Sequence, residues 1–328
     1  MIKTGSDFSG VGAFDQALRK LGIDYQTIYA CDWDKYSRQT YIENYGEPDY
    51  FPKDVYEREI PKESLDLYMT SPPCQAFSLA GKRKGEDDER GILFYNSHEF
   101  IQKNNPRYFI FENVRGLLSD ADGVTFKVWL DMLGGKSVNG NPVLFPNKNS
   151  TPYHIYWQVL NAKHYGVPQN RERVFIIGIR DDADNTFRFP KTQQLTKKLK
   201  DVLEDSVDDK YFLSEKAING VINTNNKRVN QNYSKHKNTI EKGDFMDSYN
   251  QTIHKEVTPT ITSRITGSNN YHIFEEKQIR RLTPRECFRL MDFPDTFKWS
   301  VSDTQAYKQA GNSIVVNVLA EIINKLNL

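Results

Sequence analysis

Residues 4–21, TGSDFSGVGAFDQALRKL, combine a strand, a glycine-containing turn and a helix in one short stretch. Thr4–Phe8 can form a short strand, and Ala13–Leu21 carries its apolar residues at helical spacing. The turn that joins them, Asp7–Phe14, contains two glycines and would lie at the carboxyl end of the strand. Open α/β sheets bind their ligands at this end of their strands. The stretch therefore predicts an α/β fold with a ligand beside the turn.

The residues that follow continue the alternation of strand and helix. Helical periodicity marks two further segments, Asp34–Tyr45 and Val124–Leu133. Apolar runs of strand length occur at Gln26–Cys31, Leu65–Thr70, Tyr108–Phe111, His154–Leu160 and Val174–Ile179. Strands interleaved with helices in this way are typical of a doubly wound α/β sheet.

A polar stretch at 181–276 interrupts this pattern. It is rich in Asn, Lys, Asp and Thr and shows weak periodicity, whereas helical spacing returns at Thr283–Met291 and Val315–Leu326. A smaller domain inserted into a larger one is the natural interpretation. We therefore expect a main domain at 1–185, an inserted domain at 186–276 and a returning segment at 277–328.

Composition excludes several classes of protein. Hydrophobic residues make up 38% of the 328 residues and aromatic residues 12%, which is typical of a globular protein rather than a disordered one. The longest apolar runs have strand length, so we expect no membrane span and no signal peptide. The cysteines, Cys31, Cys74 and Cys287, form no CxxC pair. This spacing argues against disulfides or a cysteine-rich metal site and indicates a reducing, cytoplasmic compartment.

The net charge of +1 gives no sign of a nucleic-acid-binding protein by itself. Binding to DNA would need a polarised surface. The segment Ser214–Lys242, in which basic residues outnumber acidic ones, is a candidate for such a surface. A solvated, flexible loop is an equally good interpretation of the same segment.

The glycine-containing turn predicts a nucleoside ligand that carries no phosphate. A dinucleotide site would need a third glycine where Asp15 stands, and a carboxylate near a helix N-terminus repels phosphate. Asp32 ends the second strand, where an acid can accept from ribose hydroxyls. Trp33 could stack on adenine, and Asp54 could accept from its amino group. S-adenosylmethionine, a cationic nucleoside without phosphates, fits this set, although each acid alone could be a helix cap.

Ser71-Pro72-Pro73-Cys74-Gln75 follows the third strand and points to the chemistry. A methyltransferase acting on an amine needs no nucleophile from the protein, because the amine has its own lone pair. Cytosine C5 becomes nucleophilic only after a nucleophile adds at C6, and a thiolate both adds and leaves well. An isolated cysteine is more often a small buried side chain. The two preceding prolines place Cys74 on a loop and favour the catalytic interpretation.

Two further motifs could serve such a reaction. Glu112, in Phe111-Glu112-Asn113-Val114, closes a strand and could share a proton with cytosine N3. Arg171 and Arg173 would share a face of an extended segment, so one could hold the base and Glu112 while the other braces the site. Ordinary arginines at the surface or on phosphates remain an alternative for this pair.

Taken together and in order, these motifs resemble those of the DNA (cytosine-5)-methyltransferases of bacterial restriction–modification systems, in particular the small Hha-type enzymes. The matching stretches are DFSGVGAFDQAL, CDW, KDV, SPPCQAFSLAGKRKG, ENVRGLL, QNRERVFIIG, RRLTPREC and QAGNSIVVNVL. They cover nearly the whole chain outside the insertion. Two departures are small: the first strand begins Thr4-Gly5-Ser6 rather than with bulky aliphatic residues, and Ala13 replaces a glycine.

The resemblance implies a fold, a reaction and a set of roles. The fold would be the doubly wound mixed sheet of S-adenosylmethionine-dependent methyltransferases, with a mostly irregular or β target-recognition domain inserted. Cys74 would be the nucleophile and Glu112 the partner of N3, with Arg173 near the base and Arg171 supporting it. The cofactor, released as S-adenosylhomocysteine, would contact Phe8, Gly10, Gly12, Phe14, Asp32, Trp33, Asp54, Val55, Leu93, Asn312 and Ile314. DNA would contact Gln75, Ser78, Lys82, Arg83, Gln169, Thr260 and Arg264. No metal is expected.

The partner implied is double-stranded DNA, bound by a monomer, with a separate cognate restriction endonuclease possible and a solitary or phage enzyme as the alternative. The loop Lys82–Arg90 resembles a mobile loop that closes over DNA. Base-reading residues are expected near Ser263-Arg264-Ile265-Thr266-Gly267, where Arg264 could bind a guanine or a phosphate. A tRNA cytosine-5 methyltransferase would share these motifs, but the insertion lacks the Cys-Phe-Thr tripeptide associated with that branch.

Overall fold

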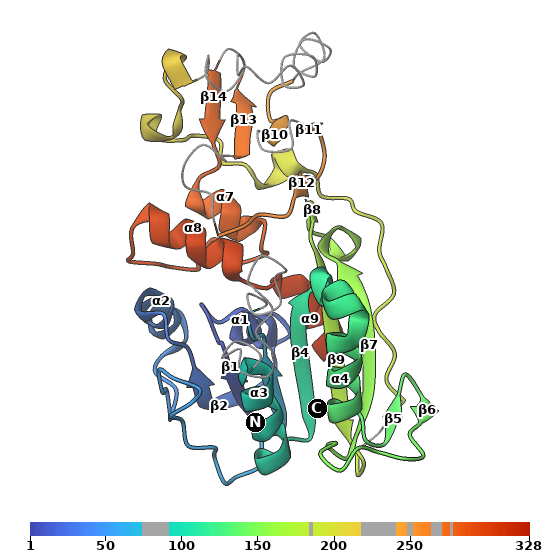
Figure 1. The fold of residues 1–328 in the computed structure, drawn as a ribbon. Helices are drawn as coiled ribbons and strands as arrows, with labels where there is room; N and C mark the ends of the chain where they lie inside the picture. Colours follow the sequence, from blue (N-terminus) through green and yellow to red (C-terminus); the bar gives the residue numbers. More distant parts are fainter. Residues whose placement is uncertain (74–91, 184–185, 218–240, 248–251, 264–270, 276–277) are drawn as a thin grey trace. The chain divides into compact units, whose positions relative to one another are not determined.

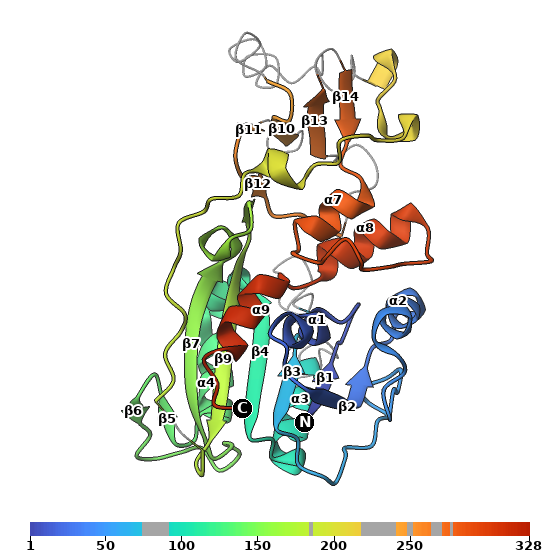
Figure 2. The same ribbon diagram turned by 180° about the vertical axis from the view of Figure 1, so that it is seen from behind.

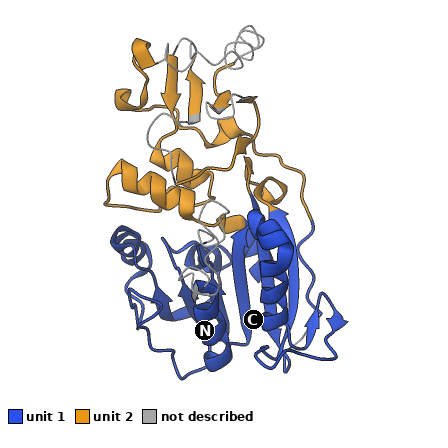
Figure 3. Ribbon diagram, viewed as in Figure 1, with its two compact units in different colours: residues 1–160, 172–191, 318–328 blue, residues 161–171, 192–317 orange. Residues whose placement is uncertain are grey.

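The computed structural model describes residues 1–73, 92–183, 186–217, 241–247, 252–263, 271–275 and 278–328 (Figure 1). The chain divides into two compact units (Figure 3). Unit 1 comprises residues 1–160, 172–191 and 318–328, and unit 2 comprises residues 161–171 and 192–317. These bounds differ from the expected segments, because most of 277–328 and the short piece 161–171 belong to unit 2.

Unit 1 is built around an eight-stranded sheet in the order β2-β1-β3-β4-β9-β7-β5-β6. Neighbours β2, β1, β3 and β4 are parallel, whereas β9 runs antiparallel to β4, so the sheet is mixed as expected. The strands are β1 (Ile2–Asp7), β2 (Tyr25–Cys31), β3 (Leu67–Thr70), β4 (Tyr108–Val114), β5 (Ser137–Val138), β6 (Asn141–Pro142), β7 (Tyr153–Asn161) and β9 (Glu172–Arg180).

Helices cover both faces of this sheet. Figures 1 and 2 show α3 and α4 on one face and α1 and α9 on the other. The bounds are α1 (Ala13–Lys20), α2 (Lys35–Tyr45), α3 (Ile92–Asn104), α4 (Val124–Leu133) and α9 (Val316–Ile323), with a 3-10 segment η2 (Arg115–Gly123). Stacked aromatic pairs fill the core under α3, with ring centroids 4.1 Å apart for Tyr68 and Phe100 and 4.4 Å apart for Phe94 and Trp129.

The expected strands and helices of this unit are present, within a few residues at their ends. α2 begins where predicted because the Asp34 carboxylate accepts from the amides of Tyr36 and Ser37. α3 was not expected, since its aromatic and polar residues give no clear apolar stripe. Among the helices of the described residues, none has the length and apolar character needed to span a bilayer.

Unit 2 contains a four-stranded antiparallel sheet in the order β11-β10-β13-β14 and a two-stranded parallel sheet of β8 and β12. Helix α8 lies in a segment for which no helix was expected, and α7 falls inside the expected Thr283–Met291. The elements are β8 (Gln169–Asn170), β10 (Phe245–Asp247), β11 (Thr252–His254), β12 (Thr258–Pro259), β13 (Tyr271–Glu275), β14 (Gln278–Arg281), α7 (Pro284–Arg289), α8 (Asp303–Asn312), η3 (Ala162–Tyr165), η4 (Leu199–Val202) and η5 (Asp209–Tyr211).

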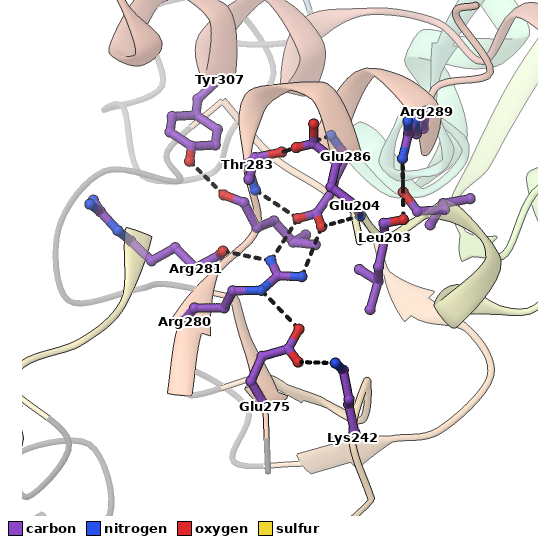
Figure 4. Close-up of polar contacts among 12 residues, drawn as sticks. Leu203, Glu204, Lys242, Glu275, Arg280, Arg281, Thr283, Glu286, Arg289 and Tyr307 are labelled. Carbon is purple, nitrogen blue, oxygen red and sulfur yellow. Dashed lines mark hydrogen bonds and ion pairs between the residues drawn. The ribbon is translucent and has the colours of Figure 1, made fainter. Parts of the chain in front are cut away.

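A buried ion cluster joins β14 to the start of α7 (Figure 4). The Arg280 guanidinium donates to both carboxylate oxygens of Glu286 at 2.9 Å, and its Nε donates to Glu275 at 3.0 Å. Glu286 also accepts from the amides of Thr283, at 2.8 Å, and Glu204, at 2.9 Å. Arg280 and Glu286 are fully buried. Because the charges are paired and hydrogen-bonded, the cluster can hold sheet and helix together without water.

Arg280→Met should lower the free energy of unfolding by about 3–5 kcal/mol, because it leaves the Glu286 charge buried without its partner. Arg280→Met/Glu286→Gln should recover most of this loss, because it removes both charges and keeps a side-chain oxygen for the amides that Glu286 accepts from. Urea unfolding curves of the two variants and the wild type give the comparison. Asp295→Asn, which breaks the exposed pair with Arg289, serves as the control and should cost under about 1 kcal/mol. A double variant as unstable as Arg280→Met would contradict this account.

Candidate active site

The parallel strands of unit 1 bring separate motifs to one edge of the sheet. In the register of β1, β3 and β4, Asp7 pairs with Thr70 and Thr70 with Phe111. The segments that follow these strands therefore start at the same edge. They are the glycine-containing turn after β1, the Ser-Pro-Pro segment after β3, and the end of β4 with Glu112.

The turn after β1 has a backbone that few residues can adopt. Phe8, Gly10 and Gly12 have φ of 56°, 54° and 83°. A Cβ at Gly12 would also lie 2.2 Å from the Tyr45 ring, so this position must be glycine. A Cβ at Gly10 would meet nothing within 4 Å, which leaves its backbone accessible to a ligand. The turn therefore has open space beside the Gly10 backbone, where a small ligand could bind.

Of the three residues predicted to hold a nucleoside, Asp32 contacts this turn, and Trp33 and Asp54 lie further along the chain. Asp32 accepts from the Gly10 amide at 2.8 Å and from the Asp34 amide at 2.9 Å, which fixes its carboxylate beside the turn. Burial raises the pKa of Asp32, although these two amide bonds oppose the effect. Trp33 is 82% exposed on the loop after β2. Asp54 accepts from the Tyr56 amide at 2.9 Å. Carboxylates that can accept from ribose hydroxyls, together with an exposed ring that can stack on a base, suit a nucleoside such as S-adenosylmethionine.

The remaining predicted cofactor residues are divided between the units. In unit 1, Phe14 and Val55 are buried, and Leu93 on α3 packs partly against the core. Asn312, the exposed last residue of α8, and Ile314, which is buried, belong to unit 2. The cofactor roles of all five of these residues therefore stay predictions.

Glu112 and Arg173 form an ion pair at the same edge. Arg173 on β9 pairs in register with Val114 on β4, two residues beyond Glu112. Residues two apart on a strand share a face, so Arg173 is the diagonal neighbour of Glu112. Arg173 Nε lies 3.1 Å from Glu112 Oε1, and the two side chains are 16% and 9% exposed. A cation thus fixes a mostly buried carboxylate beside the strand ends.

Arg171 has a different environment from Arg173. The strand breaks at this residue, so the expectation that both side chains share a face does not apply. The buried guanidinium donates to the carbonyls of Ile261 at 2.7 Å, Gly311 at 3.1 Å and Ser313 at 2.7 Å, all within unit 2. Arg171 therefore braces the backbone on both sides of Asn312, and its expected role in supporting Arg173 stays a prediction.

Gln169 does not fit the expected role of a DNA contact. The side chain is fully buried, and its amide donates to the carbonyl of Leu290 at 2.7 Å and accepts from the amide of Ile261 at 3.0 Å. A glutamine in this position joins segments of unit 2 rather than facing solvent. Thr260 is partly exposed, and its hydroxyl donates to the Asn170 carbonyl at 2.8 Å, so its contact with DNA stays a prediction.

The loop of the expected nucleophile is anchored at its start. Asn113, next to Glu112, donates from Nδ2 to the Pro72 carbonyl at 3.0 Å. No separate role was predicted for this asparagine, although it belongs to the motif ENVRGLL. Cys74, Gln75, Ser78, Lys82, Arg83 and Arg264 lie outside the described residues, as do the loop Lys82–Arg90 and most of Ser214–Lys242 and of Ser263–Gly267.

The two cysteines that the structure describes are both buried. Burial raises the pKa of Cys31 to about 12, and burial also raises the pKa of Cys287. Neither thiol therefore has the thiolate character of a nucleophile.

A family model of C-5 cytosine-specific DNA methylases matches residues 2–327. The chain belongs to this family. The methylase is 34% identical over 325 residues to the type II methyltransferase M.SsoII of Shigella sonnei. The aligned region covers 97% of the chain and 78% of M.SsoII. It is 33% identical over 323 residues to M.HhaI of Haemophilus parahaemolyticus, with 96% and 91% covered. The resemblance in the motifs is confirmed. The protein is a DNA (cytosine-5-)-methyltransferase, and its family implies S-adenosylmethionine as methyl donor.

Solved structures confirm the fold class of the methylase. A mutant of Spodoptera frugiperda DNMT2 aligns with a TM-score of 0.71 at 19% identity, with 99% of both chains covered. A putative DNA modification methyltransferase encoded within an Escherichia coli prophage aligns with a TM-score of 0.69 at 20% identity, with 100% of both chains covered.

Asp15, which stands where a dinucleotide site would have glycine, is buried in the methylase. It is 1% exposed and accepts from the Thr27 hydroxyl of β2 at 3.0 Å. Burial raises the pKa of Asp15 to about 6. Between about pH 3.8 and pH 6, the Asp15 carboxyl is therefore protonated in the native state and ionised in the unfolded chain. The contribution of Asp15 to stability is greatest below its unfolded pKa of about 3.8 and falls as the pH rises through about 6.

Asp15→Asn should therefore stabilise the methylase at neutral pH, because asparagine resembles the protonated acid. The gain in unfolding free energy should grow from pH 5 to pH 8 and reach about 3 kcal/mol, from about 1.4 kcal/mol for each unit of pKa shift. Urea unfolding of variant and wild type at both pH values measures it. A gain that is the same at pH 5 and pH 8, or larger at pH 5, would show that the acid is not protonated in the native state.

Proposed function

We propose that the enzyme extrudes a cytosine from duplex DNA, adds the Cys74 thiolate to C6 and methylates C5. The Glu112–Arg173 pair carries this proposal, because it places a fixed carboxylate beside the segment that leads to Cys74. Asn113 supports it by linking that carboxylate's strand to Pro72, two residues before the nucleophile. The buried state of Cys31 and Cys287 leaves Cys74 as the cysteine suited to attack.

The residues of the chain would act on the base in sequence. The thiolate of Cys74 forms a bond to C6, and the ring electrons move toward N3. Glu112 gives a proton to N3, which makes C5 nucleophilic. Arg173 holds the Glu112 carboxylate in place and neutralises its charge when the proton has left. Arg171 acts at a distance by bracing the loops of unit 2.

The second half of the reaction restores the ring. S-adenosylmethionine would supply an electrophilic methyl group to C5, and its sulfur would keep the electron pair of the broken sulfur–methyl bond as S-adenosylhomocysteine. Water removes the C5 proton, the electron pair returns to the C5–C6 bond, and the Cys74 thiolate leaves. The N3 proton returns to Glu112, so the net change is exchange of a C5 proton for a methyl group.

The sheet edge of unit 1 would hold the cofactor. Asp32 would accept from the ribose hydroxyls, Trp33 would stack on adenine, and Asp54 would accept from the adenine amino group. The open backbone at Gly10 would lie against the ligand, with Phe8 and Leu93 supplying apolar surface. These assignments fit a cationic ligand without phosphate, since Asp32 and Asp54 would supply carboxylates and residues 8–14 include no basic side chain.

The proposed partner is double-stranded DNA, bound by a monomer. Extruding a base costs about a few kcal/mol, which contacts to the extruded base and backbone would offset. M.SsoII and M.HhaI are named type II methyltransferases, and M.SPRI of Bacillus phage SPR is named an orphan methyltransferase. We propose the same for this enzyme: the modification partner of a separately acting restriction endonuclease, or a solitary or phage enzyme.

The proposed function is tested with unmethylated bacterial genomic DNA, bulk tRNA and S-adenosylmethionine carrying a labelled methyl group. Label should enter the DNA, and nucleoside analysis by mass spectrometry should find it in 5-methylcytosine. Bisulfite sequencing of the product then gives the target site. Label in tRNA alone would favour the RNA enzyme, and N4-methylcytosine would exclude attack by Cys74.

Glu112→Gln should lower the methylation rate on DNA by about 10²–10⁴-fold, the usual scale of acid–base catalysis, because an amide cannot supply the proton to N3. Single-turnover methylation measures this rate, and DNA binding by gel shift should change little. Arg115→Gln, which breaks an exposed ion pair with Glu172, is the matched control and should keep the wild-type rate. A Glu112→Gln rate within threefold of wild type would contradict the role assigned to the carboxylate.

A further inference from the structure

A second buried arginine cluster lies under the proposed cofactor site in unit 1. Arg58 and Asp7 form an ion pair of 2.9 Å, with side chains that are 1% and 0% exposed. The Asp7 carboxylate also accepts from the hydroxyl of Tyr68 at 2.6 Å and from that of Tyr29. Charges so deeply buried are rare unless paired, and nothing in the proposed chemistry uses them.

The composition of β1 makes room for this cluster. A Cβ at Gly5 would lie 2.6 Å from Leu65 and 3.2 Å from the Tyr29 ring. The absence of a side chain at Gly5 thus leaves room for the Tyr29 ring, whose hydroxyl reaches Asp7. A polar cluster of Asp7, Arg58, Tyr29 and Tyr68 therefore lies within the core at the end of β1.

The Arg58 guanidinium connects three segments. The Nη2 group of Arg58 donates to the Asp7 carboxylate, and Asp7 directly precedes Phe8 in the glycine-containing turn. The same guanidinium donates to the carbonyl of Val55 and, at 2.8 Å, to the carbonyl of Asn96 on α3. Each segment carries a residue that the proposed cofactor site uses: Phe8 after β1, Asp54 beside Val55, and Leu93 one helical turn before Asn96.

We infer that Arg58 is a positioning residue that sets the cofactor site by tying these three segments to one planar group. The inference rests on the proposed function. A guanidinium directs its donors in a fixed plane, so it can hold a carboxylate and two carbonyls at once, whereas the ammonium of lysine cannot span the same set. Loss of Arg58 would let the turn, the Asp54 segment and α3 shift independently. Cofactor binding should then weaken while contacts to DNA, made by other residues, persist.

The test compares binding of S-adenosylhomocysteine by calorimetry with the KM for DNA. Arg58→Met should raise the Kd of the nucleoside at least tenfold and leave the KM for DNA within about twofold. Arg58→Lys should fall between Met and wild type. Arg280→Met is the matched control, because it also breaks a buried arginine pair but belongs to unit 2, whereas the three segments belong to unit 1. All variants are measured at a temperature at which circular dichroism shows them folded.

Asp7→Asn/Arg58→Met provides a second variant should Arg58→Met fail to fold. It removes both charges, so the folded state should survive, yet the links to Val55 and Asn96 are still lost. Weak binding of S-adenosylhomocysteine by this folded variant supports the inference. Binding equal to wild type, or an equal rise of Kd in Arg280→Met, overturns the inference alone. A wild-type protein that binds no S-adenosylhomocysteine overturns the proposed cofactor site together with it.

Discussion

The parallel pairing of β1, β3 and β4 is the constraint on which the rest of the enzyme depends. It brings the ends of three strands, distant in sequence, to one edge of a sheet. β9 then runs antiparallel beside β4, so that its first residues arrive where β4 ends. This register makes Arg173 the diagonal neighbour of Glu112. A slip of one residue in β9 would turn Arg173 to the opposite face and leave the carboxylate without its cation.

Buried arginines link segments within each unit. Arg280 joins a strand to a helix through Glu286, Arg171 holds loop carbonyls around Asn312, and Arg58 ties the segments beneath the cofactor turn. Each guanidinium offers several donors in a fixed plane, which suits it to link backbone segments that no regular hydrogen-bond ladder connects. Arg173, the partner of Glu112, lies at the reacting edge itself.

Much of the fold and part of the site could be predicted from the sequence. The turn after β1 was recognisable because glycines and a following helix leave few alternative structures, and strand ends were marked by the acids and prolines that follow. α3 escaped prediction because its aromatic residues pack inward among polar ones. The burial of Gln169 could not be foreseen, since it depends on the distant Leu290 and Ile261. The Arg58 cluster had one signal in the sequence, the glycine at position 5 near the end of β1.

The central claim, that Cys74 attacks C6 beside Glu112, is tested most directly by trapping the adduct. Duplex DNA in which 5-fluorocytosine replaces cytosine is incubated with the enzyme and S-adenosylmethionine, then digested and analysed by peptide mass spectrometry. Once C5 carries both fluorine and methyl, no proton can leave, so the thioether should persist on the peptide containing Cys74 and be absent from Cys74→Ser. An adduct on another residue, or methyl transfer to ordinary DNA by Cys74→Ser, would contradict the account.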